Sequence, residues 1–196
     1  MKIRSLAVAP LGLALALMSA AQMRNNMQPT MKCENRSDDQ RRYCEVREQT
    51  MAYPGQLTID GRQNGGVSVK GWDRNDVLVR MKLDARGSNE ADARSLAGQI
   101  RVNTSAGKIS ADGPKSDGEG GWSVSYEVFA PHQANLEVIA HNGGVSISDI
   151  QGSIHFSTVN GGAHIERLNG DVQGKTVNGG LHVELMGNHW EGQGLD

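Results

Sequence analysis

Apolar and polar residues alternate along the second half of the chain, as in the segment Val145-Ser146-Ile147-Ser148. A period of two residues is typical of a β-strand with one buried face and one face in solvent. The tripeptide Asn-Gly-Gly precedes these segments and recurs every 18 residues. Asn-Gly adopts positive φ at little cost and therefore marks tight turns. The predicted turn residues are Asn142, Gly143, Gly144, Asn160, Gly161, Gly162, Asn178, Gly179 and Gly180.

The 18-residue units also match in whole columns of apolar positions. Because a unit of this length cannot bury its own apolar face, we expect the units to stack with equivalent columns about 4.8 Å apart. The pattern predicts a short β-solenoid over residues 135–196, in preference to an antiparallel sandwich. The apolar columns are Val145, Ala163 and Leu181; Ile147, Ile165 and Val183; Ile150, Leu168 and Met186; and Ile154, Val172 and Trp190.

This stacking makes two further predictions. Asn142, Asn160 and Asn178 should lie in one row, and the column that contains Ile165 should face inward. One more period after Asn178 reaches residue 196, where the given sequence stops. We therefore expect an incomplete solenoid, whose last unit either continues in a longer chain or is covered by self-association.

Residues 53–134 carry a looser form of the same pattern and predict an irregular β region that leads into the solenoid. Its single predicted helix spans about residues 89–97, with Asn89 as N-cap, Asp92 in the first turn and Gly98 as the stop. The fold class expected for the whole chain is therefore mainly β with one helix. Strands are expected at 56–59, 67–70, 77–83, 99–104, 108–111 and 122–129, with Gly71 and Trp72 in a turn after the second of them.

The first 21 residues have the pattern of a secretory signal peptide. Lys2 and Arg4 precede an apolar run from Leu6 to Leu17, and Ser19-Ala20-Ala21 supplies small residues before a cut at Gln22. The alternative, a membrane anchor, is disfavoured because the run is too short to span a bilayer. We expect an exported protein in the periplasm, at the cell surface or outside the cell, with no transmembrane segment after cleavage. Residues 22–52 are predicted to form a polar arm.

Cys33 and Cys44 lie eleven residues apart in this arm. In an exported protein, an isolated pair of cysteines is most simply a disulfide, with Cα atoms within about 7 Å. A redox role is disfavoured because the sequence has no Cys-x-x-Cys motif and no βαβ pattern around the pair.

Composition narrows the function classes. The formal net charge is −2, which argues against a nucleic-acid binder. The 25 glycines have no Gly-X-Y period, and two cysteines cannot form a four-cysteine zinc site. The sequence also predicts no cofactor.

Histidines offer weak candidates for a metal site. His164 and His182 share a polar column, so their rings should stack on one solvent face, and Glu166 and Glu184 follow two residues later. A zinc or copper site with two histidines and one glutamate is geometrically conceivable. We favour the simpler interpretation, exposed strand residues without a metal, because a metal site needs supporting hydrogen bonds around its ligands.

Other chemistry is less well supported by the sequence. No acidic column persists through the units, so calcium is not expected. Glu166 and Glu184 have a spacing suited to a retaining glycosidase but should lie on a flat face, and we expect no catalytic residues. Trp72 and Trp122 could stack on sugars, whereas Trp190 is expected in the core.

The chain resembles the putative-adhesin family of bacterial exported proteins, a domain of unknown function. The family's name implies adhesion, and the resemblance supplies no catalytic residues. The segments that carry it are Asn64-Gly65-Gly66-Val67-Ser68-Val69, Trp122-Ser123-Val124-Ser125-Tyr126, Leu136-Glu137-Val138, His141-Asn142-Gly143-Gly144-Val145-Ser146-Ile147 and the Thr-Val-Asn-Gly-Gly copies that begin at Thr158 and Thr176.

These observations together predict a non-catalytic binding or scaffold module of the cell envelope or surface. Its expected partner is an envelope component, either a glycan or a protein. The alternative is a polysaccharide-acting enzyme, a lyase or a glycosidase, with its site on the solenoid face. A cleft with several carboxylates would favour the enzyme.

Overall fold

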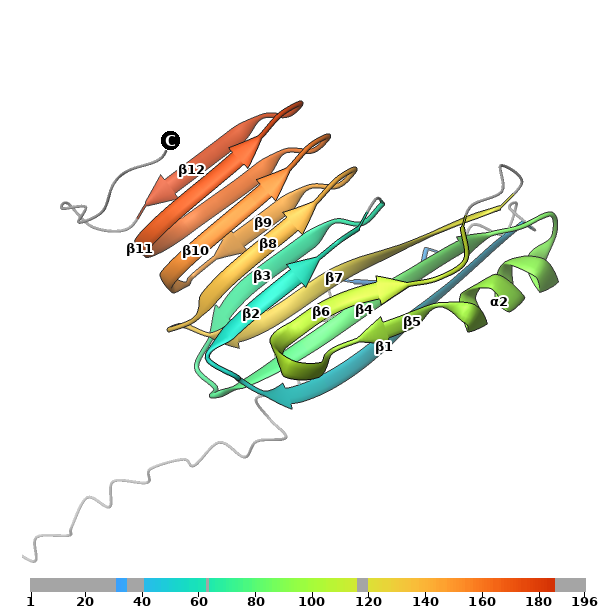
Figure 1. Ribbon diagram of the computed structural model, residues 1–196, viewed down its shortest axis with the longest axis horizontal. Helices are drawn as coiled ribbons and strands as arrows, with labels where there is room; N and C mark the ends of the chain where they lie inside the picture. Colours follow the sequence, from blue (N-terminus) through green and yellow to red (C-terminus); the bar gives the residue numbers. More distant parts are fainter. Residues whose placement is uncertain (1–30, 35–40, 63, 116–119, 186–196) are drawn as a thin grey trace, which may run out of the picture. The chain divides into compact units, whose positions relative to one another are not determined.

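The computed structural model describes residues 31–34, 41–62, 64–115 and 120–185. Twelve strands join in one sheet, and a single α-helix is present in this part of the chain (Figure 1). The predicted signal peptide, most of the polar arm before residue 41, and Met186, Trp190 and Leu195 lie outside the described residues. No helix in the described ranges is long and apolar enough to cross a membrane.

The strands are divided between two facing arms of the sheet. In chain order they are β1 (Arg42–Ala52), β2 (Gln56–Asp60), β3 (Val67–Trp72), β4 (Asp76–Arg86), β5 (Arg101–Asn103), β6 (Lys108–Asp112), β7 (Gly121–Pro131), β8 (Asn135–Ala140), β9 (Val145–Ser148), β10 (Gln151–Thr158), β11 (Ala163–Thr176) and β12 (Leu181–Leu185).

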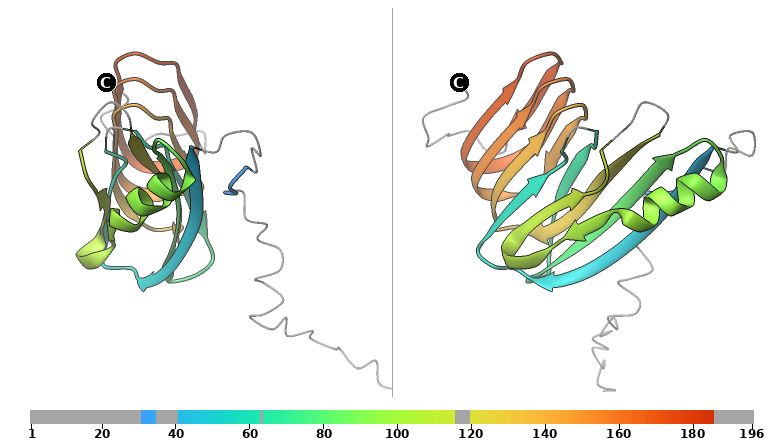
Figure 2. Two further views of the ribbon diagram at one scale, coloured as in Figure 1. Left: turned by 90° about the vertical axis from the view of Figure 1, so that its right-hand side faces the viewer. Right: turned by 45° about the vertical axis from the view of Figure 1, so that its right-hand side comes forward.

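The first arm contains β1, β4, β7, β3 and β9, with β12 added beyond the start of β11, and the second contains β5, β6, β2, β8 and β10. Strand β11 belongs to both arms, because Ala163–Glu166 pairs with β9 and β12 whereas Asn169–Thr176 pairs with β10. Arg167, at the corner between these two stretches, has a φ of 51°. The sheet therefore curls over at β11 and leaves its two arms facing each other (Figure 2).

Parallel pairing holds the C-terminal strands together. Strands β9, β11 and β12 pair in register at an offset of 18 residues, for example Ile147 with Ile165 and Ile165 with Val183. Strands β8, β10 and β11 pair at the same offset. This parallel register excludes the antiparallel sandwich. The structure confirms a mainly β fold with one helix. It shows a curled open sheet, which is a less specific architecture than the predicted solenoid.

The expected row of asparagines is present. The Nδ2 atom of Asn178 donates to Oδ1 of Asn160 at 2.8 Å, and Asn160 donates in the same way to Asn142 at 2.7 Å. The row continues to Asn64, which accepts from Asn142 at 3.1 Å. Ile165 has no exposed surface, and Val183 packs against the same core.

The helix α2 (Glu90–Gln99) begins as the sequence predicts. The Asn89 side chain accepts a hydrogen bond from the backbone N–H of Asp92 at 2.9 Å, which satisfies one of the free donors of the first turn. The helix runs past Gly98 and ends at Gln99, one residue beyond the predicted stop. Ala93 and Ala97 are buried where α2 contacts β4 and β1 (Figure 1).

Strand β1 occupies residues that the sequence placed in the polar arm. It pairs antiparallel with β4 along its whole length and is the edge strand at one end of the sheet. Its residues do not alternate between buried and exposed, because most of them are half-buried or exposed. An edge strand of this kind has no clear period of two, and the hydrophobic pattern therefore did not predict it.

Candidate functional site

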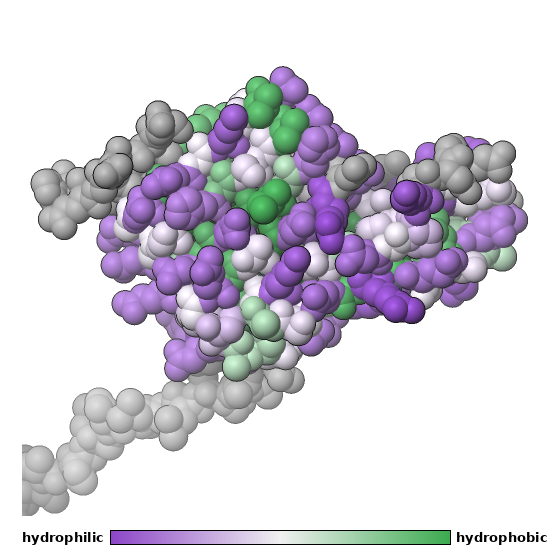
Figure 3. All heavy atoms as spheres, viewed as in Figure 1, coloured by the Kyte–Doolittle hydropathy of each residue, from purple (hydrophilic) through white to green (hydrophobic). Residues whose placement is uncertain are grey.

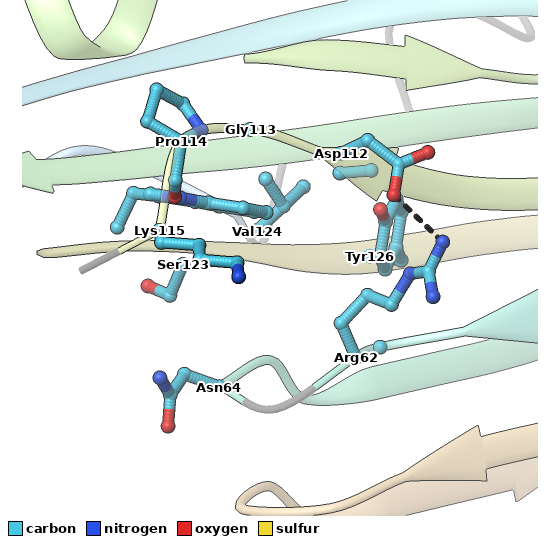
Figure 4. Close-up of a pocket in the computed structure, with 12 residues that line it drawn as sticks. Arg62, Asn64, Asp112, Gly113, Pro114, Lys115, Ser123, Val124 and Tyr126 are labelled. Atoms are coloured by element: carbon cyan, nitrogen blue, oxygen red, sulfur yellow. Dashed lines mark hydrogen bonds and ion pairs between the residues drawn. The ribbon is translucent and has the colours of Figure 1, made fainter.

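A cleft of about 460 Å³ lies where the end of β6 faces the beginning of β7 (Figure 4). The loop after β2 supplies Arg62 and Asn64, the end of β6 supplies Asp112, and β7 supplies Ser123 and Tyr126. The volume lies within the range of small-molecule sites, about 300–1,000 Å³. Its lining combines charged, amide, hydroxyl and aromatic groups, which suits a small polar ligand.

Tyr126 is a buried polar group in this lining. Its side chain faces the core from β7 and is 1% exposed, and its hydroxyl has no hydrogen-bond partner among the described residues. Burial raises the pKa of this phenol far above its usual range, with a smaller contribution from Asp60 and Asp112. The hydroxyl is therefore neutral at physiological pH and can donate a hydrogen bond. A buried hydroxyl without a partner costs about 1–3 kcal/mol, so its presence requires an explanation.

Arg62 and Asp112 form an ion pair beside Tyr126, with 2.7 Å between Nη2 and Oδ1 (Figure 4). The Arg62 backbone has a φ of 53°, and its N–H donates to the Asp60 carboxylate at 2.8 Å. This turn directs the guanidinium from the end of β2 toward the end of β6. Both side chains are substantially exposed, so their remaining hydrogen-bonding groups are accessible to a ligand.

Trp122 forms another part of the lining and is held in place by the segment after β6. Its Nε1 donates to the Pro114 carbonyl at 2.7 Å. A Cβ at Gly113 would lie 2.8 Å from the indole ring, so the absence of a side chain at this position lets the ring pack against the backbone. The half-buried indole also lines a second hollow of about 320 Å³ that reaches α2. A fixed aromatic ring with an accessible surface is suited to packing against a sugar ring.

The predicted histidine pair lies on the outer face of the first arm. His164 of β11 and His182 of β12 are register partners, and their rings stack with centroids 4.6 Å apart and an interplanar angle of 11°. The Nε2 atom of His164 lies 2.5 Å from Oε1 of Glu166. One ligand atom from each of His164, Glu166 and His182 lies within 4.8 Å of the others.

Glu166 is positioned by an arginine at the corner of the sheet. Arg167 donates to Glu166 at 2.9 Å and makes two hydrogen bonds to Asp149, at 2.7 and 2.9 Å. Hydrogen bonds from His164 and then from Arg167 hold the pKa of Glu166 below its usual range. The Arg167 guanidinium likewise lowers the pKa of Asp149. Both carboxylates are therefore ionised at neutral pH.

Glu184 is the register partner of Glu166, so the two glutamates lie on neighbouring strands as expected. The ion pair with Arg167 engages the Glu166 carboxylate. Among the described residues that line the cleft, Asp112 is the single carboxylate. The cleft and the glutamate pair are thus at different places, and neither combines an enclosed site with several carboxylates.

A shallow depression of about 750 Å³ crosses the first arm where its parallel strands begin. The first of the outward side chains in β3, β9, β11 and β12 are Ser68, Ser146, His164 and His182. The depression places the two histidines at the end of a polar row, on an open surface.

The remaining predicted residues have structural roles. Cys33 and Cys44 form the predicted disulfide, with Cα atoms 5.8 Å apart. The asparagines of the turns bond to one another, and Thr158 donates to the Gly143 carbonyl at 2.8 Å. Trp72, which the sequence offered as a sugar platform, is 7% exposed and packs against Phe129, so it is unsuited to that role.

Sequence reasoning did not find the cleft. Tyr126 occupies an inward position of a predicted strand and looked like an ordinary core residue. Arg62 and Asp112 are 50 residues apart and meet because β2 and β6 are neighbours in the sheet. The local signal was the string of turn-forming residues after each of these two strands, Gly61-Arg62 and Asp112-Gly113-Pro114.

No protein-family model and no curated protein matches this chain. Among solved structures, the chain is similar to a putative cell adhesion protein from Clostridium sporogenes, with 7% sequence identity and a TM-score of 0.37 over 67% of this chain and 68% of that one. It is also similar to a putative lipid binding protein from Parabacteroides distasonis, with 9% identity and a TM-score of 0.36 over 71% and 59% of the two chains. A putative adhesin from the same organism shares 8% identity, with a TM-score of 0.29 over 78% and 95%.

Two of these solved structures are described as a cell adhesion protein or an adhesin, at low identity to this chain. With such low identities and TM-scores, these likenesses carry no argument about ligand or activity.

Proposed function

We propose that this protein is an exported, non-catalytic binding module of the cell envelope or cell surface, and that its cleft binds a glycan. The observation that carries the proposal is Tyr126, which lines the cleft beside the Arg62–Asp112 pair and whose buried hydroxyl has no partner in the described part of the chain. A ligand acceptor that reaches this donor, after a small movement of the side chains that cover it, would remove the cost of leaving it unpaired.

A sugar supplies the groups that this cleft needs. Its hydroxyls both donate and accept, so they can bond to Tyr126, to the Asp112 carboxylate and to the Arg62 guanidinium. Its apolar ring face can pack on Trp122. Asp112 is already paired with Arg62, which favours an uncharged or weakly charged ligand over a simple anion.

The proposal of export rests on the disulfide, because such bonds persist in oxidising compartments outside the cytosol. Membership in the putative-adhesin family is part of the same proposal. We also propose that residues 135–196 form a short β-solenoid, supported by parallel pairing at an offset of 18 residues and by the row of asparagines.

The alternative of a polysaccharide-acting enzyme has less support. A glycosidase of the usual kind needs two carboxylates on either side of the bond that is cleaved. The described lining of the cleft has Asp112 alone. Incubating the protein with each bound oligosaccharide and separating the products should therefore show no cleavage.

Self-association through β12 is a further proposal about partners. Within the described residues, β12 pairs with β11 alone. Val177, in the turn before β12, is 56% exposed, and Leu181, the first residue of β12, is 47% exposed. Figure 3 shows an apolar patch at the corresponding end of the sheet. Light scattering should show a concentration-dependent increase in mass that the Leu181→Lys variant lacks.

Tyr126→Phe provides a test with two readouts of opposite sign. Removing an unpaired buried hydroxyl should leave the free energy of unfolding unchanged or raise it by about 1 kcal/mol. The same change should weaken glycan binding by about tenfold, since it removes a hydrogen bond of about 1.4 kcal/mol to the ligand. Binding can be measured on an array of bacterial envelope oligosaccharides, followed by calorimetric titration with the strongest hit.

Tyr53→Phe is the matched control. The Tyr53 hydroxyl donates to the Gly55 carbonyl at 2.6 Å and accepts from the Asn135 N–H at 2.8 Å, away from the cleft. This control should lower stability and leave binding unchanged. If no oligosaccharide binds, or if Tyr126→Phe and Trp122→Ala bind as tightly as the wild type, the cleft is not a glycan site.

A further inference from the structure

We infer that His164, Glu166 and His182 form a site for a divalent transition-metal ion such as Zn²⁺ on the outer face of the first arm. This inference is independent of the proposed glycan cleft. Two imidazoles and one carboxylate are a common set of three protein ligands for zinc, and a water molecule completes the tetrahedron.

The parallel register brings the ligands together. Because β11 and β12 pair with His164 opposite His182, the two rings leave the sheet on the same face and stack 4.6 Å apart. Glu166 lies two residues along β11 and therefore projects from the same face. The three ligand atoms lie within 4.8 Å of one another, so a single ion can reach all three after small side-chain movements.

The contact between His164 and Glu166 brings two of the three ligand atoms close together. Their Nε2 and Oε1 atoms lie 2.5 Å apart. Zinc bonds to nitrogen and oxygen are about 2.0–2.2 Å long, which places two tetrahedral ligands about 3.4 Å apart. These two surface side chains would have to separate by about 1 Å, and any proton that the two atoms share would leave to solvent as the ion binds.

Glu166 has the supporting hydrogen bonds that a metal ligand needs. Metal-binding carboxylates are usually held by further hydrogen bonds, which fix their direction. Arg167 bonds to Oε2 of Glu166, so Oε1 remains for the metal. Asp149 holds Arg167 through two hydrogen bonds, one to each carboxylate oxygen. Arg167 therefore fixes the Glu166 carboxylate, and Asp149 in turn fixes Arg167.

A metal here would fasten one strand to the next. His164 and Glu166 belong to β11, whereas His182 belongs to β12, which pairs with no other strand in the described part of the chain. Since the ion would bridge the two strands, it should suppress the opening of β12. This expectation gives a readout that does not depend on any activity.

The test is calorimetric titration of the untagged mature chain, purified after export, with ZnCl2. We expect one Zn²⁺ per chain, with affinity lowered at least about tenfold in each of His164→Ala, His182→Ala and Glu166→Gln. His155→Ala is the matched control, because His155 is an exposed strand histidine on β10 of the other arm. Its affinity for Zn²⁺ should equal that of the wild type.

Hydrogen exchange gives the second measurement. Zn²⁺ should slow exchange of the β12 amides, Leu181–Leu185, in the wild type and in His155→Ala but not in His182→Ala. The inference is overturned if the chain binds no stoichiometric Zn²⁺. It is equally overturned if His164→Ala and His182→Ala retain wild-type affinity, which would place the ion elsewhere.

Discussion

Glycines of the Asn-Gly-Gly turns differ in how closely the neighbouring backbone approaches them. A Cβ added at Gly161 would lie 2.2 Å from the Gly143 carbonyl oxygen, whereas one at Gly162 would lie 3.4 Å from the Gly180 carbonyl oxygen. The first distance is a severe overlap with backbone, and the second is an ordinary contact. The first glycine of the turn is therefore required by the stacking of the chain on itself.

Gly161→Ala should lower the free energy of unfolding by about 1–3 kcal/mol, because the new methyl group must push two turns apart. Gly162→Ala, in the same turn, is the control and should have a small effect. Urea unfolding followed by circular dichroism measures both. Equal effects of the two substitutions would show that the close approach at Gly161 is absent in solution.

At the scale of elements, a charged network on the outer face joins the three long antiparallel strands. Arg80 of β4 donates to Glu48 of β1 at 2.8 Å and to Glu127 of β7 at 3.1 Å. The Arg80 and Glu127 side chains are 9% and 11% exposed, and the guanidinium lies over the Phe129 ring. A charge this deeply buried requires its partner.

Arg80→Met should destabilise the protein by about 3 kcal/mol, because it keeps the apolar volume but leaves the Glu127 carboxylate buried and unpaired. The control is Arg47→Met on β1. Arg47 pairs with Glu45 of the same strand and is more exposed, so its loss should have little effect. If thermal unfolding midpoints fall equally in both variants, the network does not hold the strands together.

The disulfide also links separate segments, because it joins Cys33 covalently to Cys44 of β1. Replacing both cysteines with serine should lower the free energy of unfolding by about 2–3 kcal/mol, since the unfolded chain gains the freedom of an open loop. Urea unfolding of the wild type in reducing buffer should reproduce this loss. Free thiols detected by alkylation after native export would contradict the pairing.

At the scale of the whole molecule, β11 connects the two arms of the sheet. Its first residues pair with β9 and β12, and its last residues pair with β10. The apolar side chains of both arms form one continuous core between them. Destabilising β11 should therefore unfold the C-terminal strands of both arms before it unfolds the antiparallel strands β1, β4 and β7.

Ile165→Asp should unfold the C-terminal half, because Ile165 has no exposed surface and the new carboxylate would be buried without a partner. Hydrogen exchange should show loss of protection in β9–β12, with protection retained longest in β4 and β7. In metal-free buffer, His164→Ala, the next residue on the opposite face, should change stability by less than about 0.5 kcal/mol. A large effect of that control would contradict the exposed position of His164.

The amino-acid sequence by itself determined the local features of this protein. Alternation fixed which side chains face inward, as at Ile165, and the 18-residue spacing fixed which asparagines meet. The cap at Asn89 and the pairing of Cys33 with Cys44 were predicted correctly for the same reason. Each depends on residues that are near in the chain or repeat at a constant interval, so short-range physical rules suffice.

The tertiary structure alone decided how distant segments pair. Strand β1 has no clear alternation because it is an edge strand, and its place beside β4 depends on partners such as Arg80. The cleft needs Arg62 from the loop after β2 to meet Asp112 of β6 and Tyr126 of β7. The support for Glu166 needs a corner that brings Arg167 to Asp149. Such contacts are set by competition among many possible strand pairings, which is settled by the burial of the whole core rather than by any local pattern.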